Sequence, residues 1–381
     1  MVAEKLKLPF KVKNPILALG SQSKNAVCFV RGNFAYLSPV HADLNNPRDF
    51  LNFEKGVRYF LKNNPKIIAY DLHPDYQSTK YALSLNAKRY TLYAIQHHHA
   101  HIASCMAENG MKNQKLIAVA FDGTGLGDDG NLWGGDFFIC DYSGYQRKAH
   151  LRYIPLLGAE KAIWQPWRMA CAWLYLIYKD RMFDLGIDFL KKIDKNKWPV
   201  IKKMYDSGLN SPLTSSMGRL FDAVASIVLN KTDVQSEAEA AIELEKKAAA
   251  FNRAAGSAGL RQAYSFKIKT QHKKYIIEPQ PVINDIIAEL KKGRPKGMIA
   301  FKFHDGLARA VRNTSLLLRE ETGINQVVLA GGVFQNKVLL SLALDLLYKE
   351  DFKVFYPQQL SRNDAGICLG QAAIANFKSR D

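Results

Sequence analysis

Four histidines stand close together in the sequence, and two of them have the spacing of metal ligands. They are His97, His98, His99 and His101. Residues four apart on a helix lie on one face, about one turn from each other. His97 and His101 have that spacing, which two imidazoles on a helix need to share a metal ion. Asp122 follows a buried apolar stretch further along the chain and is a candidate third ligand.

The cluster also has two simpler interpretations, and both stay open. It could be a histidine-rich surface, or a helix start whose imidazoles are satisfied by polar neighbours. Helical rotation turns His98 and His99 away from the face that His97 and His101 share, so they are weaker ligand candidates. His99 could still contact a ligand side chain and fix its orientation without binding the metal itself. Because four of the nine histidines fall within five positions, we favour the metal site.

Apolar stretches and turns around the histidines predict the elements that hold them. Residues 90–95 predict a strand that leads into the histidine helix, which continues through Glu108. Residues 116–121 predict a buried strand ending at Asp122. The glycines of residues 122–130 predict a polar turn whose backbone can approach a ligand. Two further strands are expected at residues 132–141 and 147–153.

The first 85 residues have a similar order. Residues 16–19 and 26–30 predict a hairpin, whose polar turn can hold phosphate between backbone amides. The pattern then predicts a strand at 34–38, a helix at 49–63, a strand at 67–72 and a helix at 75–85. Two halves that each open with a hairpin and a polar turn indicate a repeated α/β architecture, although their sequences are only weakly alike.

Helices dominate the middle of the chain, from residue 160 to about residue 256. They are expected at 164–178, 215–229 and 237–251, the second with an N-cap cluster at Thr214, Ser215 and Ser216. Helical spacing places Arg219 and Asp222 on a solvated face.

Strands and helices alternate again in the last third. The pattern predicts a helix at 305–322, strands at 326–330 and 353–356, and helices at 335–348 and after Asn363. Gly331 and Gly332, at a strand end, permit the close approach of a nucleotide. Asp364 has two interpretations, a cap for the final helix or a carboxylate at the mouth of a cleft. The local pattern favours the cap.

Composition indicates a soluble globular protein with an unusual charge. The 381 residues carry a net charge of +18, much of it near the N-terminus and in residues 191–203 and 267–296. Such faces attract polyanions, but a generally basic surface explains them equally well. The cysteines (Cys28, Cys105, Cys140, Cys171 and Cys368) form no C-x-x-C pair, which suits a reducing cytoplasm. Neither a signal peptide nor a membrane span is visible, so we expect a cytoplasmic location and no membrane partner.

Eight ordered motifs from about residue 15 onwards resemble the carbamoyltransferase region of HypF, the maturation factor that makes the cyanide ligands of [NiFe]-hydrogenases. They include Asp71-Leu72-His73-Pro74-Asp75-Tyr76, Gln96-His97-His98-His99-Ala100-His101, Asp122-Gly123-Thr124-Gly125, Trp133-Gly134-Gly135-Asp136, Pro166-Trp167-Arg168-Met169-Ala170, Gly218-Arg219-Leu220-Phe221-Asp222-Ala223-Val224, Gly331-Gly332-Val333-Phe334-Gln335-Asn336 and Asn363-Asp364. The region is also similar to the ATPase that adds threonylcarbamoyl groups to tRNA and to antibiotic O-carbamoyltransferases.

The resemblance implies a two-lobed, actin-like (ASKHA) α/β ATPase fold built from two RNase H-like halves. The lobes would be residues 1–114 and 115–381, the second with a helical insertion at about 160–260. The implied metal ligands are His97, His101, Asp122 and Asp364, which reverses the local preference for a cap at Asp364. The implied nucleotide contacts are Lys24, Asn25, Gly123, Thr124, Gly218, Asp222, Glu237, Gly331, Gly332 and Asn336. Ala238 and Ala159 stand where the family usually has glycine.

The function implied by the resemblance is transfer of a carbamoyl group from carbamoyl-adenylate to the C-terminal cysteine of a HypE-like acceptor protein. The cofactors would be iron or zinc and ATP or carbamoyl-adenylate, with Mg²⁺ as a further candidate. Full-length HypF makes the adenylate in upstream domains, so a separate carbamoyl-adenylate-forming protein or domain is expected as a partner. Carbamoylation of tRNA or of a small molecule is the alternative, with nucleic acid a less favoured partner.

Overall fold

The computed structural model describes residues 2–85, 88–255 and 263–380. The first half contains strands β1 (Glu4–Lys7), β2 (Ile16–Ala18), β3 (Ser23–Asn25), β4 (Cys28–Arg31), β5 (Phe34–Leu37), β6 (His41–Asp43), β7 (Ile67–Asp71) and β8 (Thr91–Ile95), with helices α1 (Pro47–Leu61), α2 (Gln77–Ser84) and α3 (His97–Glu108).

The second half contains strands β9 (Leu116–Leu126), β10 (Leu132–Cys140), β11 (Tyr145–Leu151), β12 (Ile154–Pro155), β13 (Leu213–Thr214), β14 (Lys267–Gln271), β15 (Lys274–Glu278), β16 (Gln326–Ala330) and β17 (Lys353–Phe355). Its helices are α4 (Lys161–Trp164), α5 (Trp167–Tyr178), α6 (Asp188–Lys191), α7 (Trp198–Ser207), α8 (Met217–Leu229), α9 (Glu239–Ala255), α10 (Gln280–Lys291), α11 (Lys296–Thr322), α12 (Lys337–Lys349) and α13 (Ile367–Lys378). Short 3₁₀ turns η1 (Lys179–Leu185), η2 (Gly332–Gln335) and η3 (Asp364–Gly366) complete the described elements.

The two main sheets repeat one topology. The first sheet contains the order β5-β4-β2-β7-β8 and the second the order β11-β10-β9-β16-β17. In each, the first three strands along the chain pair antiparallel and the last two join them in parallel. This confirms the repeat that the sequence only weakly indicates. Strands β1 and β14–β15 extend the sheets at their outer edges.

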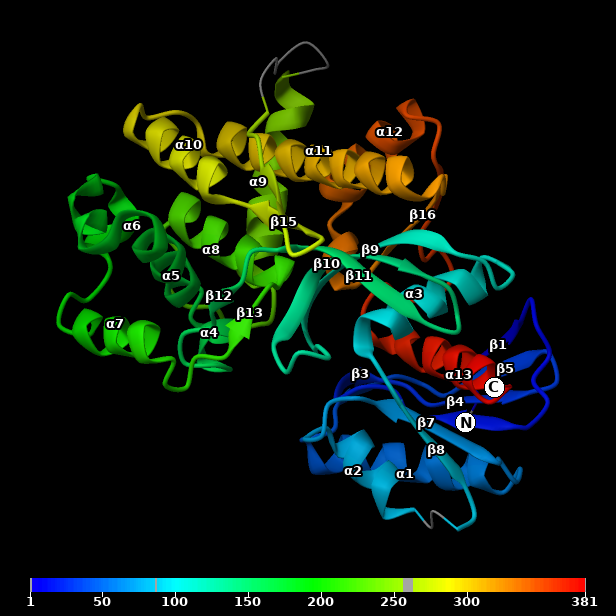
Figure 1. Cartoon of the computed structure of the whole chain (residues 1–381). Helices are drawn as coiled ribbons and strands as arrows, with labels where there is room; N and C mark the ends of the chain where they lie inside the picture. The colour runs from blue at the N-terminus through cyan, green and yellow to red at the C-terminus, as the bar shows by residue number, and fades with distance from the viewer. Residues whose placement is uncertain (1, 86–87, 256–262, 381) are drawn as a thin grey trace.

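Helices and sheets alternate in layers (Figure 1). Helices α1 and α2 cover one face of the first sheet, with Phe53 and Phe60 in that core. Helices α3 and α13 lie between the two sheets, where one apolar cluster joins residues of both. The other face of the second sheet is covered by the larger core that includes α5, α8 and α11. Thus α13, although last in the chain, packs against the first sheet.

Several expected boundaries differ from the structure. Strand β9 continues to Leu126, because its pairing with β10 extends to the pair Leu126–Leu132, so the turn between the strands is limited to residues 127–131. The helix expected at 164–178 begins only at Trp167, directly after Pro166, and residues 161–164 form the separate short helix α4. Proline cannot donate the backbone hydrogen bond that would join the two. Helix α11 begins at Lys296, nine residues earlier than predicted. Residues 256–260 of the predicted helical insertion lie outside the described residues, and the lobe boundaries stay a prediction.

Across the described parts of the chain, no helix has both the length and the apolar character needed to cross a bilayer.

Candidate metal centre and ligand cavity

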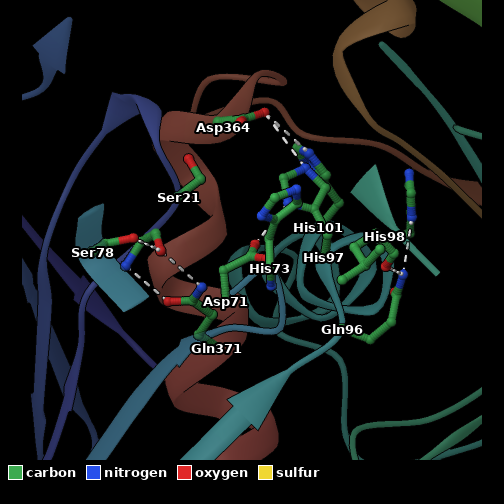
Figure 2. A network of polar contacts seen from close by, with 12 residues as sticks. Ser21, Asp71, His73, Ser78, Gln96, His97, His98, His101, Asp364 and Gln371 are labelled. Atoms are coloured by element: carbon green, nitrogen blue, oxygen red, sulfur yellow. Dashed lines mark hydrogen bonds and ion pairs between the residues drawn. The ribbon is translucent and has the colours of Figure 1, made fainter. Parts of the chain in front are cut away.

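Two imidazoles and two carboxylates converge where α3, β9 and η3 meet. His97 and His101 come from α3, Asp122 from β9 and Asp364 from η3, and one ligand atom of each lies within 4.8 Å of the others. The Nε2 atoms of His97 and His101 lie 3.3 and 3.2 Å from Asp122 Oδ2. They lie 3.8 and 3.5 Å from Asp364 Oδ1, and Figure 2 shows both imidazoles turned towards that carboxylate. The four predicted metal ligands are therefore adjacent.

The donor atoms of this cluster fit a cation. His97 Nε2, His101 Nε2 and Asp122 Oδ2 are buried and have no hydrogen-bond partner. Burial alone disfavours charge on these groups, but the carboxylates of Asp71 and Asp364 raise the pKa of His97 well above its ordinary value. Burial likewise opposes ionisation of Asp122, whereas His101 and His97 hold its pKa well below the usual range. Unpaired nitrogen and oxygen atoms facing one point are what Zn²⁺ or iron binds.

Asp71 supports the cluster from behind, a role that was not predicted from the sequence. Its Oδ2 lies 2.8 Å from Nδ1 of His97, which leaves Nε2 of that ring facing the other ligands (Figure 2). The register explains the contact, because Asp71 ends β7 opposite Ile95 of the parallel strand β8, two residues before His97. The sequence did contain a signal for this contact. Asp71 belongs to one of the family motifs and ends a strand that was expected close to the strand before the histidine helix.

The other two histidines are buried but point elsewhere. His98 Nδ1 lies 3.1 Å from Gln96 Nε2, and its ring stacks near Trp133. His99 Nε2 lies 2.7 Å from the carbonyl oxygen of Asp141, away from the cluster, so the expected supporting role of His99 is not observed. Burial lowers the pKa of His98 well below its ordinary value and that of His99 to about 4. Burial thus disfavours the charged form of both rings, and their polar contacts lie outside the four-residue cluster.

A cavity of about 430 Å³ opens beside Asp122 and Asp364. Its lining contains eight of the ten predicted nucleotide contacts together with these two carboxylates: Lys24, Gly123, Thr124, Gly218, Asp222, Glu237, Gly332 and Asn336. Tyr76, Arg219, Glu245 and Gln335 also line it. These four were not among the ligand contacts predicted from the sequence. The cavity is large enough for much of a nucleotide.

Asn25 and Gly331 are not lining residues but shape the cavity wall. The Asn25 side chain donates hydrogen bonds to the carbonyl oxygens of Leu19 and Ser21, which fixes the turn that presents Lys24. Gly331 has φ +96°, and a Cβ there would lie 2.4 Å from the carbonyl oxygen of Phe121. Glycine is therefore required for β16 to end against β9.

Arg219 and Asp222 are buried, so the prediction of a solvated helix face is wrong. Each side chain is 4% exposed, and the Arg219 guanidinium lies 2.9 Å from Asp222 Oδ2. Burial raises the pKa of Asp222 to about 6, although Arg219 opposes this shift. The cavity and α9 cover this face of α8, and helical spacing alone cannot reveal that cover.

One ion pair joins the walls of the cavity across its mouth. Lys24, on β3 of the first half, lies 2.6 Å from Glu237, which precedes α9 in the second half. Coulombic contributions from Glu237, Asp364 and Asp122 raise the pKa of Lys24 against the opposing effect of burial. A lysine at this place offers a positive charge to an anionic ligand.

The fold and the site define an actin-like, two-lobed α/β protein, and comparison with known proteins identifies its family. Residues 118–371 match the family model described as "Carbamoyltransferase, Kae1-like Domain, second subdomain", and residues 11–108 match "HypF Kae1-like domain". The chain belongs to the HypF carbamoyltransferase family.

Relatives and a solved structure agree with this assignment. The chain is 33% identical to carbamoyltransferase HypF of Synechocystis sp., covering 98% of this chain and 48% of that protein. It is 33% identical to a shorter HypF homolog of Cupriavidus necator, covering 95% of this chain and 91% of the homolog. A crystal structure of full-length HypF in a phosphate- and nucleotide-bound form superposes with a TM-score of 0.89 at 37% identity, over 98% of this chain and 47% of that one. The predicted fold class is thereby confirmed, and the chain spans about half the length of the longer relatives.

Proposed function

We propose that this chain transfers a carbamoyl group from carbamoyl-adenylate to a cysteine thiol of an acceptor protein. The observation that carries the proposal is the cavity of about 430 Å³, large enough for much of a nucleotide, that opens beside Asp122 and Asp364 of the four-residue cluster. Kinship to proteins named carbamoyltransferase supports the choice of reaction. The bond that breaks in such a substrate is the one between the carbonyl carbon and the phosphate oxygen, so the anhydride must lie at the metal end of the cavity.

His97, His101, Asp122 and Asp364 would hold one divalent metal, iron or zinc. When bound, the metal supplies Lewis-acid polarisation of a carbonyl or phosphate oxygen. Asp71 keeps the His97 ring in the orientation that the site needs. Gly332 donates its backbone N–H to Asp122 Oδ1 at 3.1 Å, which leaves Oδ2 of that carboxylate for the cluster.

The nucleotide would lie with its phosphates near the metal and Lys24, and its adenosine between α9 and the Gly331–Asn336 segment. The side chains of Lys24 and Thr124 and the backbone at Gly123 offer donors at the phosphate end. Apolar side chains of Ala241, Ile242 and Val333 line the other end. Orienting the mixed anhydride against the thiol is the main task of the chain.

The attacking sulfur would come from a partner. All five cysteines of this chain are buried, so each lacks the access that a nucleophile needs. The partner's thiolate would attack the carbonyl carbon, forming the C–S bond as AMP departs with the bond electrons. A HypE-like protein with a C-terminal cysteine is the proposed acceptor. The carbamoyl-adenylate would be supplied by a separate protein or domain.

Mass spectrometry of a HypE-like acceptor tests this function. The acceptor is incubated with this chain, ATP and carbamoyl phosphate, with and without a supplied adenylate-forming domain. A carbamoyl mass gain on the cysteine only when that domain is present is the expected result, and a His97→Ala/His101→Ala variant should give none. No gain with metal and nucleotide both bound would reject a thiol acceptor.

The net charge of +18 favours a second candidate, carbamoylation of an RNA. Filter binding with tRNA over a range of salt separates the two candidates. Affinity that persists at physiological salt and depends on the RNA sequence would favour RNA. A steep loss with salt and no preference would mark counterion-driven attraction to a basic surface.

A further inference from the structure

A buried histidine outside the metal centre supports one wall of the cavity. His304 lies on α11 with no exposed surface, and its ring packs against Phe221 and Phe303 with centroids 5.3 and 5.9 Å away. Both of its ring nitrogens have a polar neighbour. Each neighbour constrains where the ring proton can be.

The first neighbour determines the tautomer. His304 Nδ1 lies 2.7 Å from the carbonyl oxygen of Ala300, one turn earlier on the same helix. A carbonyl oxygen only accepts hydrogen bonds, so Nδ1 carries the proton. Burial lowers the pKa of His304 to about 4, although the Ala300 carbonyl opposes the shift, so the ring is neutral near pH 7. Its Nε2 is therefore an acceptor.

The second neighbour is Asn336, which lines the cavity. Asn336 Nδ2 lies 2.9 Å from His304 Nε2 and must donate to it. Independently, Asn336 Oδ1 accepts the backbone N–H of Leu339 at 2.9 Å as the N-cap of α12. Both bonds require the same orientation of the amide. One N–H of Nδ2 is used by His304, and the second is left for a ligand in the cavity.

The surroundings of Asn336 suit a planar base. Helix α9 meets the start of α12 here. The side chain of Glu245, on α9, accepts a hydrogen bond of 2.7 Å from the backbone N–H of Lys337, the first residue of α12. Ile242, on α9, and Val333, three residues before Asn336, also line the cavity. A cavity wall that combines these apolar side chains with the fixed donor of Asn336 would accept an aromatic ring that presents a ring nitrogen.

We propose that His304 is a positioning residue that fixes Asn336 as a hydrogen-bond donor to a ring nitrogen of an adenine base. The inference rests on the proposed function in assuming that the cavity binds an adenine nucleotide. Without the His304 acceptor, the amide of Asn336 loses one of the two bonds that hold it, and its free N–H is no longer held towards the base.

Calorimetry with ATP and its 1-deaza, 3-deaza and 7-deaza analogues tests this role. Each analogue lacks one ring nitrogen, and wild-type protein should bind one of them about 3- to 10-fold more weakly than ATP, the range of a single hydrogen bond. His304→Phe keeps a ring but cannot accept, so it should bind ATP weaker by a similar factor and distinguish none of the analogues. His304→Gln, which can accept from Asn336 and donate to Ala300, should restore the preference. Metal content should be equal in all three proteins.

The opposite results are equally definite. Wild-type affinities for ATP and all three analogues within twofold of each other would overturn the proposal, as would a His304→Phe variant that keeps the wild-type preference. Nitrogen NMR of labelled histidine in wild-type protein measures the tautomer directly, and a proton on Nε2 would overturn it without any variant. If wild-type protein binds none of the four nucleotides, the proposed nucleotide function fails, while the tautomer measurement still decides the orientation of Asn336.

Discussion

At the scale of single residues, the contact between Asp71 and His97 predicts how tightly metal is held. We expect Asp71→Asn to weaken metal affinity about 10- to 100-fold, because a carboxylate behind an imidazole fixes its orientation and raises its basicity. Competition with a chelating dye measures the affinity. Asp75→Asn is the matched control, since Asp75 is exposed and close in sequence. Equal affinities of the two variants would contradict the role of Asp71.

Ala238 gives a second prediction at this scale. It lines the cavity with φ +60°, a left-handed backbone conformation that is energetically unfavourable for a residue with a Cβ. Ala238→Gly removes this conformational cost from the folded state but also makes the unfolded chain more flexible, which opposes the gain. The net result should be a free energy of unfolding that is higher by about 0.5–1 kcal/mol.

Denaturant unfolding with a control in the next helix checks this prediction. Ala250→Gly, at an exposed position of α9, should lower the free energy of unfolding by about 1 kcal/mol. A loss of stability in both variants would show that the strain at Ala238 is absent.

Residue spacing could predict which histidines of the cluster lie together but not the environment of the cluster. His97 and His101 lie on one helix, so a local rule finds them, and Asp122 follows from its place at the end of a buried strand. The family motifs were needed for Asp364, where the local pattern favours a helix cap. Arg219 and Asp222 were misassigned because their burial depends on α9, a separate helix that covers them only after folding, and the helical spacing of α8 alone does not show this cover. Asp71 was missed as a partner of His97 for the same reason, since the pairing of β7 with β8 brings the two together.

At the scale of elements, α3 and α13 cross closely near the site. A Cβ on Gly370 of α13 would lie 1.8 Å from the carbonyl oxygen of Ala100 on α3. Gly370→Ala should therefore destabilise the fold by about 3 kcal/mol or more, because two backbones would have to separate.

Thermal unfolding with a second glycine variant tests the crossing. Gly144→Ala places its Cβ in open space and should change stability by less than about 0.5 kcal/mol. If Gly370→Ala and Gly144→Ala have the same Tm, the crossing tolerates a methyl group and the expected close packing is wrong.

Element boundaries depended on contacts that local patterns do not contain. Gly123 and Gly125 favour a turn locally, yet both lie in β9 because β10 pairs with that strand beyond them. Gly306 lies inside α11, where it lets the backbone of Tyr264 approach, since a Cβ there would lie 2.4 Å from the Tyr264 carbonyl oxygen. Strands such as β16 were predictable because their apolar run is complete within the element.

At the scale of the whole molecule, the metal would join three segments that are far apart in the chain. Its ligands come from α3, β9 and η3. These segments meet only in the folded state, so a bound ion should stabilise that state against unfolding. Adding Zn²⁺ to chelator-treated protein should raise the free energy of unfolding by about 2.7 kcal/mol at a free concentration one hundred times the dissociation constant.

Differential scanning calorimetry on the treated protein measures this stabilisation. The His97→Ala/His101→Ala variant should show no metal-dependent shift in Tm. A similar shift in that variant would place the stabilising ion elsewhere in the molecule.

The place of α13 also has a consequence during synthesis on the ribosome. Gln371 exchanges hydrogen bonds of 2.9 and 3.1 Å with the backbone of Gly20, across 351 residues of sequence. At roughly 5–20 residues per second, the face of the first sheet that α13 covers would stay exposed on the nascent chain for roughly 20–70 seconds after β2 is made. An apolar surface bare for that long is a binding site for chaperones, and a translation pause before residue 367 would prolong the period in which the chain can aggregate.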